Sequence, residues 1–449
     1  GIYFINEDIE EATEIYNKLE ANKRKGLQER NKFLDKINLK PPSNYDTRHS
    51  LANELSLYTW CNYIGCDNQL DEVLKHVKHN VYFKHTILLN DISDNNKHLI
   101  KLPRFGYGPK VLLIDDEANK GWGIFYQHFF SNSRNITFDI YNVDKTKSRE
   151  EIIEEGSEKI KDENPDVVLL DLRLDEKDTN ETDPKKLTGY QFVDEIKKVN
   201  EGIQVIVTTA SNKAPVLKEL LDFGANGYII KDNDPINSIN HLISQIERSI
   251  KEAKILKGFF ANLAFSEKRI KNNKFDKVTN DDEYERFVNN MLVYIDIAKK
   301  TAKNHKIENR FSHCIHQLYL VLEAITGYYI DANKNEYYFR DKENNKKYIY
   351  YYEYNYNLKK YECKYSKDHL NRQQLLYNLY TYKVGKINHG LFYKVHQLVN
   401  YRNNYVAHHN KRYDKKLEIL YKSDSINVFK DNFMEYHSAF SEYIDDLTN

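Results

Sequence analysis

Four short runs of apolar residues, each ending in polar or charged side chains, constrain the fold of this chain more than any other feature. The run Val167–Leu170 ends at Asp171 and shows no helical spacing of its apolar residues, which is typical of a strand buried on both faces of a parallel sheet. Similar runs start at Val111, Val205 and Gly227 and end at Asp115, Thr209 and Lys231. Because parallel strands bring their carboxyl ends to one edge, the sequence predicts a doubly wound α/β domain with a five-stranded parallel sheet and with these side chains gathered there. The fifth strand is expected at Ile136–Val143.

Three of the side chains at that edge are carboxylates, from Asp115, Asp116 and Asp171. Packed together they repel one another unless a cation lies among them. Ligands that offer only oxygen favour Mg²⁺ over zinc or copper. The pattern therefore predicts a magnesium site at this edge of the sheet.

With these motifs in this order, residues 109–250 resemble a response-regulator receiver domain of the CheY-like kind. The resemblance implies that Asp171 is the phosphoacceptor, which takes a phosphoryl group from a phosphohistidine or a small phospho-donor. It implies that Mg²⁺ is held by Asp115, Asp116, Asp171 and the backbone carbonyl of Arg173. The implied partner is a sensor histidine kinase or a phosphotransfer protein.

The resemblance also implies roles for three further side chains. Lys231 would pair with the phosphoryl oxygens, Thr209 would hydrogen-bond them, and Tyr228 would be the aromatic switch. Two features depart from the family pattern: the long acidic insert Leu172–Thr188 before Gly189, which could cover the site or bind a partner, and Asp232 where proline is common. The alternative is a degenerate receiver that keeps the fold and is never phosphorylated.

The C-terminal part, residues 251–449, has the helix-spaced apolar residues of a bundle, interrupted at about 337–365 by tyrosines that alternate with charges. This alternation is typical of an antiparallel hairpin or meander. The sequence therefore predicts a helical output domain with a small β insertion. The helix that begins at Pro235 has no clear stop before about Lys257 and is expected to continue as the connector.

Within that bundle, Arg402-Asn403 followed by His408 is similar to the motif of HEPN domains, many of which are metal-independent ribonucleases that act as dimers. The resemblance implies an endoribonuclease that acts on RNA as a homodimer, with Arg402, Asn403 and His408 as catalytic residues. A histidine can move the proton of a ribose hydroxyl while an arginine stabilises the charge on phosphorus. The alternatives are an ion-paired surface arginine with a histidine favoured at a helix end, and a C-terminal module that binds protein or nucleic acid without catalysis.

Residues 1–108 are expected to form a mostly helical N-terminal domain of unknown role, with one helix from about Thr47 to Ile64. His49 faintly resembles the phosphorylated histidine of histidine kinases, although a plain amphipathic helix is the simpler interpretation. Four ligand-type residues precede the sheet, namely Cys61, Cys66, His76 and His79. Their spacing suits a zinc module poorly, so buried thiols and solvated histidines are expected.

Charge and cysteine content limit the setting in which the protein works. Residues 109–250 carry a net charge of −9 and residues 251–449 a net charge of +9, so the acidic part could dock on the basic part, or the basic part could bind nucleic acid. DNA-binding transcription control is disfavoured because no helix-turn-helix pattern follows residue 250. Four cysteines in 449 residues, with no signal peptide, indicate reduced thiols and a cytoplasmic protein. No apolar run approaches the roughly 18 residues of a membrane-spanning helix.

Overall fold

The computed structural model describes two stretches of the chain, residues 48–66 and 102–448, with internal gaps. The gaps fall at 132, 134, 182, 211–213, 233, 273–274, 305–306, 308–309, 334–335, 341–349, 356, 366–369 and 402–425. Contacts divide the chain into two compact units, residues 1–254 and 255–449. Each unit is described by itself.

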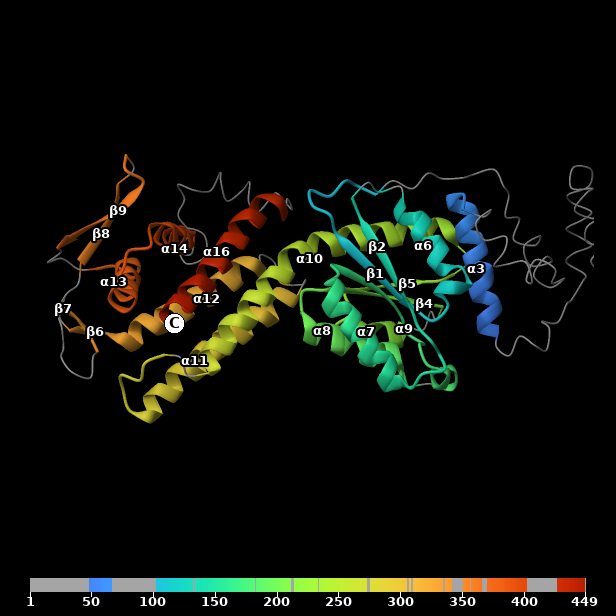
Figure 1. Ribbon diagram of the computed structural model, residues 1–449, viewed down its shortest axis with the longest axis horizontal. Helices are drawn as coiled ribbons and strands as arrows, with labels where there is room; N and C mark the ends of the chain where they lie inside the picture. The colour runs from blue at the N-terminus through green and yellow to red at the C-terminus, as the bar shows by residue number, and fades with distance from the viewer. Residues whose placement is uncertain are drawn as a thin grey trace, which may run out of the picture. The chain divides into compact units, whose positions relative to one another are not determined.

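The first unit is built on a five-stranded sheet in which every strand pair is parallel. Its strands are β1 (Lys110–Asp115), β2 (Thr137–Asn142), β3 (Val167–Asp171), β4 (Gln204–Thr209) and β5 (Gly227–Ile230). They lie in the order β2-β1-β3-β4-β5, and Figure 1 labels β1, β2, β4 and β5 of this sheet. The doubly wound parallel sheet predicted from the four apolar runs is therefore confirmed, and its fifth strand is the half-buried β2.

Helices cover both faces of this sheet because alternate strand residues point to opposite sides. The helices are α3 (Arg48–Ile64), α6 (Trp122–Ser131), α7 (Arg149–Glu163), α8 (Thr188–Val199), α9 (Ala214–Phe223) and α10 (Pro235–Lys271). Val111 and Leu113 pack with α3, α6 and the first half of α10, whereas Leu112 and Ile114 pack with α7 and α8. The start of α7 is marked by a capping box between Ser148 and Glu151, which satisfies two backbone donors of its first turn.

Helix α3 belongs to the packed core of the first unit. Leu55, Leu57, Trp60 and Ile64 are buried in the same cluster as the β1 side chains. The sequence predicts that residues 1–108 form a domain of their own and that the receiver spans residues 109–250. These limits stay predictions. The structure shows that the described part of that segment packs on the sheet domain.

The sequence predicts that the helix from Pro235 has no stop before about Lys257 and continues as a connector. In the structure this helix, α10, ends at Lys271. Its residues up to Ile250 pack in the core of the first unit, and those from Ile255 pack in the core of the second. The two units are therefore joined by continuous helical backbone.

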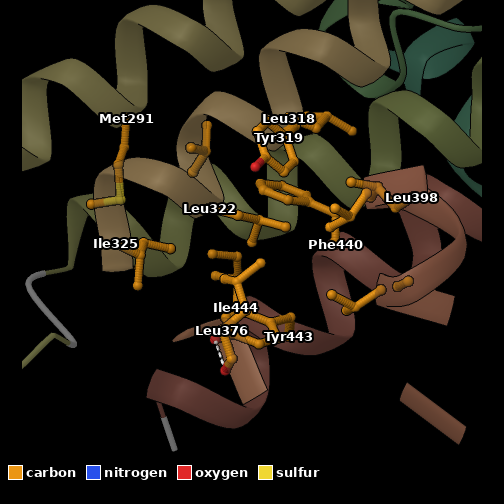
Figure 2. Packing of buried hydrophobic residues seen from close by; sticks show 14 of the residues in the cluster. Met291, Leu318, Tyr319, Leu322, Ile325, Leu376, Leu398, Phe440, Tyr443 and Ile444 are labelled. Atoms are coloured by element: carbon orange, nitrogen blue, oxygen red, sulfur yellow. Dashed lines mark hydrogen bonds between the residues drawn. The ribbon is translucent and has the colours of Figure 1, made fainter. Parts of the chain in front are cut away.

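The second unit is a helical bundle with two small hairpins. Its further helices are α11 (Asp281–Lys303), α12 (Arg310–Tyr329), α13 (Arg372–Val384), α14 (His389–Tyr401) and α16 (Ile426–Thr448). Leu322, Phe440 and Ile444 meet in its core, and the Tyr443 hydroxyl donates to the Leu376 carbonyl oxygen over 2.9 Å (Figure 2). The predicted C-terminal helical bundle is confirmed, and its limits stay predictions.

The β insertion of this unit consists of two antiparallel pairs. They are β6 (Ile330–Asn333) with β7 (Glu336–Phe339), and β8 (Tyr350–Asn355) with β9 (Lys360–Tyr365). In β8 the alternation seen in the sequence separates buried Tyr352 from exposed Tyr351. The insertion thus starts a few residues before the predicted 337 and ends at the predicted 365. Over the described residues, no helix combines the length and apolar character needed to cross a membrane.

Candidate functional site

The carboxyl edge of the sheet brings together the charged residues predicted from the strand ends. Strands β1 and β3 pair in register, Ile114 beside Leu170, so Asp115 and Asp171 end the two strands next to each other. The Nζ atom of Lys231, just after β5, lies 3.0 Å from Asp115 Oδ2 and 3.0 Å from Asp171 Oδ1. The Lys231 side chain is only 2% exposed, so this ammonium is a buried bridge between the two carboxylates.

The second aspartate of the pair, Asp116, has a different partner. Its buried carboxylate forms an ion pair with Lys145, from the loop between β2 and α7. Sequence reasoning did not single out Lys145, because no motif marks a lysine in a loop. Only the sheet order, which places β2 beside β1, brings this side chain to the site.

The pKa values of two of these acids are raised, chiefly by burial. Burial, together with the charge of Asp171, raises the pKa of Asp115 to about 6 even though Lys231 lowers it. Burial, Asp171 and Asp115 raise the pKa of Asp116 to about 7, against the opposing effect of Lys145. Each shift reflects the cost of ionising a carboxyl group away from water and close to another negative charge.

The pKa values of Lys231 and Glu117 shift so that the charged form of each side chain is favoured. Burial by itself would lower the pKa of Lys231, but Asp115 and Asp171 hold it well above its usual value. Burial likewise opposes ionisation of Glu117, yet Lys120 and Lys231 lower its pKa. Lys231 is therefore charged throughout the physiological range, and it is the central cation of the site.

The remaining predicted residues lie around this centre. The Arg173 backbone N–H donates to Asp171 Oδ2 over 2.8 Å, which orients the carboxylate. Thr209 is buried, and its carbonyl oxygen accepts from the Lys231 backbone N–H over 2.7 Å. Tyr228 is half-buried against the cluster that contains Leu220. Arg173 and Thr209 thus contact Asp171 and Lys231, whereas Tyr228 packs on the neighbouring apolar cluster. The chemical roles of all three residues stay predictions.

The fit of Mg²⁺ to this edge depends on the donors and on the cations already present. The donor set is oxygen only, and the raised pKa values of Asp115 and Asp116 show a demand for positive charge. Within the part of the chain that the structure describes, however, no three ligand-type side chains are arranged to hold a metal ion. Lys231 and Lys145 are the cations found among the carboxylates. The donor chemistry suits Mg²⁺, and the described side chains that pair with these carboxylates carry ammonium groups.

The acidic insert Leu172–Thr188 is held together by hydrogen bonds to the carboxylate of Asp178, one of its own residues. The Asp178 side chain is fully buried and accepts from the backbone N–H groups of Leu174, Asp175 and Thr188 and from the Arg149 guanidinium. Two short 3-10 helices, Glu176–Asn180 and Pro184–Lys186, complete the insert. The carboxylate of Asp178 is therefore committed to holding the insert together and does not serve as a free ligand for a partner.

Gly189, which follows the insert, lies against the backbone that carries Asp171. A Cβ atom added there would sit 2.4 Å from the Asp171 carbonyl oxygen and 2.7 Å from Leu172 Cα. We expect Gly189→Ala to lower the free energy of unfolding by about 1–3 kcal/mol, because backbone must move to admit the methyl group. Urea unfolding followed by tryptophan fluorescence measures this. Gly106→Ala, where nothing lies within 4 Å, is the matched control, and equal effects of the two changes would contradict the steric explanation.

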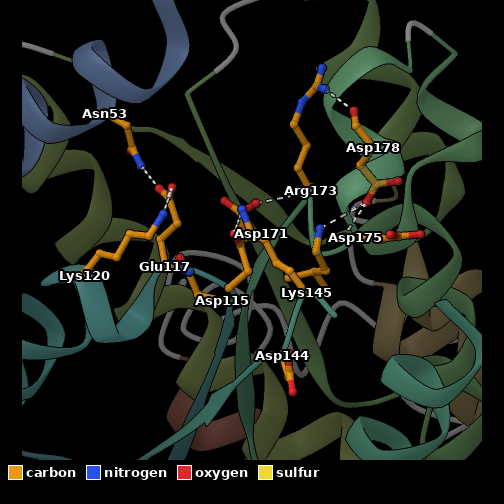
Figure 3. A network of polar contacts seen from close by, with 12 residues as sticks. Asn53, Asp115, Glu117, Lys120, Asp144, Lys145, Asp171, Arg173, Asp175 and Asp178 are labelled. Atoms are coloured by element: carbon orange, nitrogen blue, oxygen red, sulfur yellow. Dashed lines mark hydrogen bonds and ion pairs between the residues drawn. The ribbon is translucent and has the colours of Figure 1, made fainter. Parts of the chain in front are cut away.

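Helix α3 contributes three hydrogen bonds to the loops that carry the site, and no sequence motif indicates them. The Asn53 side-chain amide donates to Glu117, as Figure 3 shows. The Ser56 hydroxyl donates to the Lys231 carbonyl oxygen over 3.1 Å. The Trp60 indole N–H donates to the Asp232 carbonyl oxygen over 2.8 Å. The helix is thus attached to the backbone on which Lys231 is mounted.

Several predicted residues lie outside the described part of the chain. These are Arg402, Asn403, His408, His76 and His79, together with the side chain of His49. Cys61 and Cys66 are described, and both side chains are buried.

Comparison with known proteins decides what the sheet domain is. Residues 132–243 match the family model of the response regulator receiver domain. The chain contains a response regulator receiver domain. The matched part of the receiver includes Asp171, Thr209 and Lys231 and starts after Asp115 and Asp116, which the sheet register brings beside Asp171. The receiver predicted from the sequence is thereby confirmed.

Curated relatives of the receiver are response regulators of bacteria. A nitrate/nitrite response regulator protein homolog of Haemophilus influenzae is 26% identical over 170 residues, covering 38% of this chain and 70% of the relative. The transcriptional regulatory protein KdpE of Staphylococcus aureus is 28% identical over 151 residues, covering 33% of this chain and 54% of the relative. A solved two-component response regulator of the LuxR family from an Aurantimonas species is 18% identical with a TM-score of 0.23, covering 32% of this chain and 95% of that one.

Proposed function

We propose that the receiver accepts a phosphoryl group on Asp171 and thereby controls the helical second unit. The observation that carries this proposal is Lys231 Nζ at 3.0 Å from both Asp115 and Asp171. A buried ammonium in that position can stabilise the charge that a phosphoryl group adds beside Asp171. The donor would be a phosphohistidine of a sensor histidine kinase or phosphotransfer protein, or a small phospho-donor.

The transfer is a displacement at phosphorus. A carboxylate oxygen of Asp171 forms a new P–O bond while the P–N bond of the phosphohistidine breaks, and the departing imidazole takes up a proton. The Arg173 N–H and Lys231 each hold an oxygen of the attacking carboxylate. These contacts align the nucleophile, and alignment with electrostatic stabilisation is the main requirement of phosphoryl transfer.

Asp115, Asp116 and Asp171, with the Arg173 backbone carbonyl, would hold Mg²⁺ at this edge. When bound, Mg²⁺ would supply positive charge next to the phosphoryl oxygens. Thr209 would hydrogen-bond a phosphoryl oxygen, and its attachment to the Lys231 backbone would carry a change at the site toward Tyr228.

The test is phosphorylation of the full chain with acetyl phosphate and Mg²⁺, followed by intact mass. The expected result is one added phosphoryl group that is lost in mild alkali, as an acyl phosphate is. Asp171→Asn should abolish the addition, whereas Asp194→Asn, on the exposed face of α8, should leave it unchanged. An unmodified wild-type chain would favour the degenerate receiver, and modification that survives in Asp171→Asn would place the phosphoryl group elsewhere.

For the output we propose a HEPN-type endoribonuclease that acts on RNA as a homodimer through Arg402, Asn403 and His408. The helical bundle of the second unit supports this proposal, because HEPN domains are all-helical bundles. A net charge of +9 in residues 251–449 suits an RNA substrate. The second candidate is a binding module without catalysis.

Incubation of the purified chain with RNA, with and without acetyl phosphate, separates the two outputs. Cleavage that changes with phosphorylation and disappears in His408→Ala supports the ribonuclease. RNA that stays intact under both conditions supports the binding module. Arg412→Ala, a basic residue beyond the motif, is the control for a general loss of RNA affinity.

A further inference from the structure

We propose that Lys145 is a tethered competitor of Mg²⁺: its ammonium takes the place beside Asp116 that the metal ion would take, and metal binding requires it to leave. This inference deepens the proposed function, because it assigns a control of metal entry to the same site. The observation is the ion pair between Lys145 and the buried Asp116 carboxylate. This ion pair explains why, among the described residues, the three converging carboxylates are not arranged as a ready set of metal ligands.

The loop between β2 and α7 is built to present Lys145 to the site. Just before it, the Val143 N–H donates to the Asp115 carbonyl oxygen over 3.2 Å. Just after it, the Thr146 N–H and hydroxyl donate to Asp144 Oδ1 over 3.0 and 2.7 Å. The backbone on both sides of Lys145 is therefore held, and only the side chain needs to move.

The different burial of Asp116 and Lys145 favours replacement of the lysine ammonium by a metal ion. The Asp116 side chain is 4% exposed, whereas the Lys145 side chain is 37% exposed. The carboxylate is nearly enclosed, whereas the lysine stem is long enough to move its ammonium out into solvent when a metal ion takes over the pairing. In this pair the cation is the exchangeable member.

Formal charge also balances for exchange and not for simple addition. Above the raised pKa values of Asp115 and Asp116, the ionised Asp115, Asp116 and Asp171 carry three negative charges and Lys231 with Lys145 supplies two positive ones, while Glu117 is matched by its pair with Lys120. Replacement of the Lys145 ammonium by a divalent cation makes this group neutral. Addition of a divalent cation with Lys145 still in place would leave an excess positive charge in a buried site, which is unfavourable.

The experiment is a Mg²⁺ titration of the full chain by calorimetry, with tryptophan fluorescence as a second readout. The Trp122 ring lies 4.7 Å from Lys231 Nζ, so its emission should respond when cations at the site rearrange. Lys145→Gln is expected to bind Mg²⁺ about tenfold more tightly than wild type, a change of about 1.4 kcal/mol. Lys145→Arg should stay within about threefold of wild type, because it retains the competing charge.

Lys147→Gln is the matched control. Lys147 lies two residues away in the same loop but pairs with Glu155 over 2.7 Å, so its removal changes the charge of the loop without freeing Asp116. Its Mg²⁺ affinity should equal that of wild type. A gain as large as that of Lys145→Gln would reduce the effect to general electrostatics and overturn the proposal.

Each of the remaining outcomes of the Mg²⁺ titration also supports or overturns the proposal. Equal affinity of wild type and Lys145→Gln overturns the proposal, and so does the absence of Mg²⁺ binding in both. If Lys145→Gln is unfolded in EDTA, refolding by Mg²⁺ but not by Na⁺ at equal ionic strength supports it, and failure to refold opposes it. None of these readouts uses phosphorylation, so failure of Asp171 to accept a phosphoryl group is a separate result.

Discussion

Replacement of Lys231 by methionine is expected to lower the free energy of unfolding of the receiver by about 3–5 kcal/mol at pH 8. Methionine keeps the length and apolar stem of lysine, so the loss comes from the charge. Without the ammonium, the buried carboxylate of Asp115 and the partly buried one of Asp171 lose the partner that lies 3.0 Å from each of them. Removing one partner of a buried ion pair is costly because the other charge remains away from water.

The penalty should depend on pH in a defined direction. The pKa of Asp115 is already raised to about 6 and that of Asp116 to about 7, and loss of Lys231 raises the pKa of Asp115 further. An acid whose folded-state pKa is raised gives its full stability below its unfolded pKa, near 4, and loses it as pH rises through the folded pKa. The difference between wild type and Lys231→Met should therefore be largest at pH 8 and shrink towards pH 5.

Tryptophan fluorescence measures this change in the receiver alone, because both tryptophans of the chain, Trp60 and Trp122, belong to the first unit. Urea unfolding in EDTA at pH 5 and pH 8 gives the two free energies. Lys120→Met, which removes an exposed lysine paired with Glu117 at 3.2 Å, should change stability by no more than about 0.5 kcal/mol. Adding Asp116→Asn to Lys231→Met should recover part of the loss. A penalty that is equal at both pH values would refute the electrostatic account.

The sheet and its charged edge could be predicted from the sequence because local patterns specify them. Buried parallel strands appear as continuous apolar runs, and the residue after each run must lie at one edge. The runs ending at Asp115, Asp171 and Lys231 therefore indicate by themselves which groups meet. The alternating tyrosines around Tyr352 predicted a hairpin for the same reason.

The remaining features of the site depend on contacts between distant segments. Lys145 lies in a loop, and its approach to Asp116 follows from the strand order. The hydrogen bonds of α3 join Ser56 to Lys231 across 175 positions, a distance at which sequence carries no local signal. The role of Asp178 was missed because a carboxylate in an acidic insert looks like a solvated charge, whereas this one is fully buried.

Trp60 provides the second large effect, because it joins α3 to the receiver. Its side chain is fully buried, and its ring centroid lies 5.4 Å from those of both Trp122 and Phe125. Trp60→Ala is expected to lower the free energy of unfolding by about 3–5 kcal/mol, through lost burial and the cavity that remains. Trp60→Phe keeps an aromatic ring and loses the hydrogen bond to the Asp232 carbonyl, so about 1–2 kcal/mol is expected.

The fluorescence of Trp122 reports the unfolding of both Trp60 variants, since this second tryptophan lies in the same core. The order of stability should be wild type, Trp60→Phe, Trp60→Ala. A loss below about 1 kcal/mol in Trp60→Ala would mean that α3 is dispensable to the folded receiver. The expected order would instead make α3 a structural part of the domain, with its Ser56 and Trp60 contacts holding the backbone from which Lys231 reaches Asp115 and Asp171.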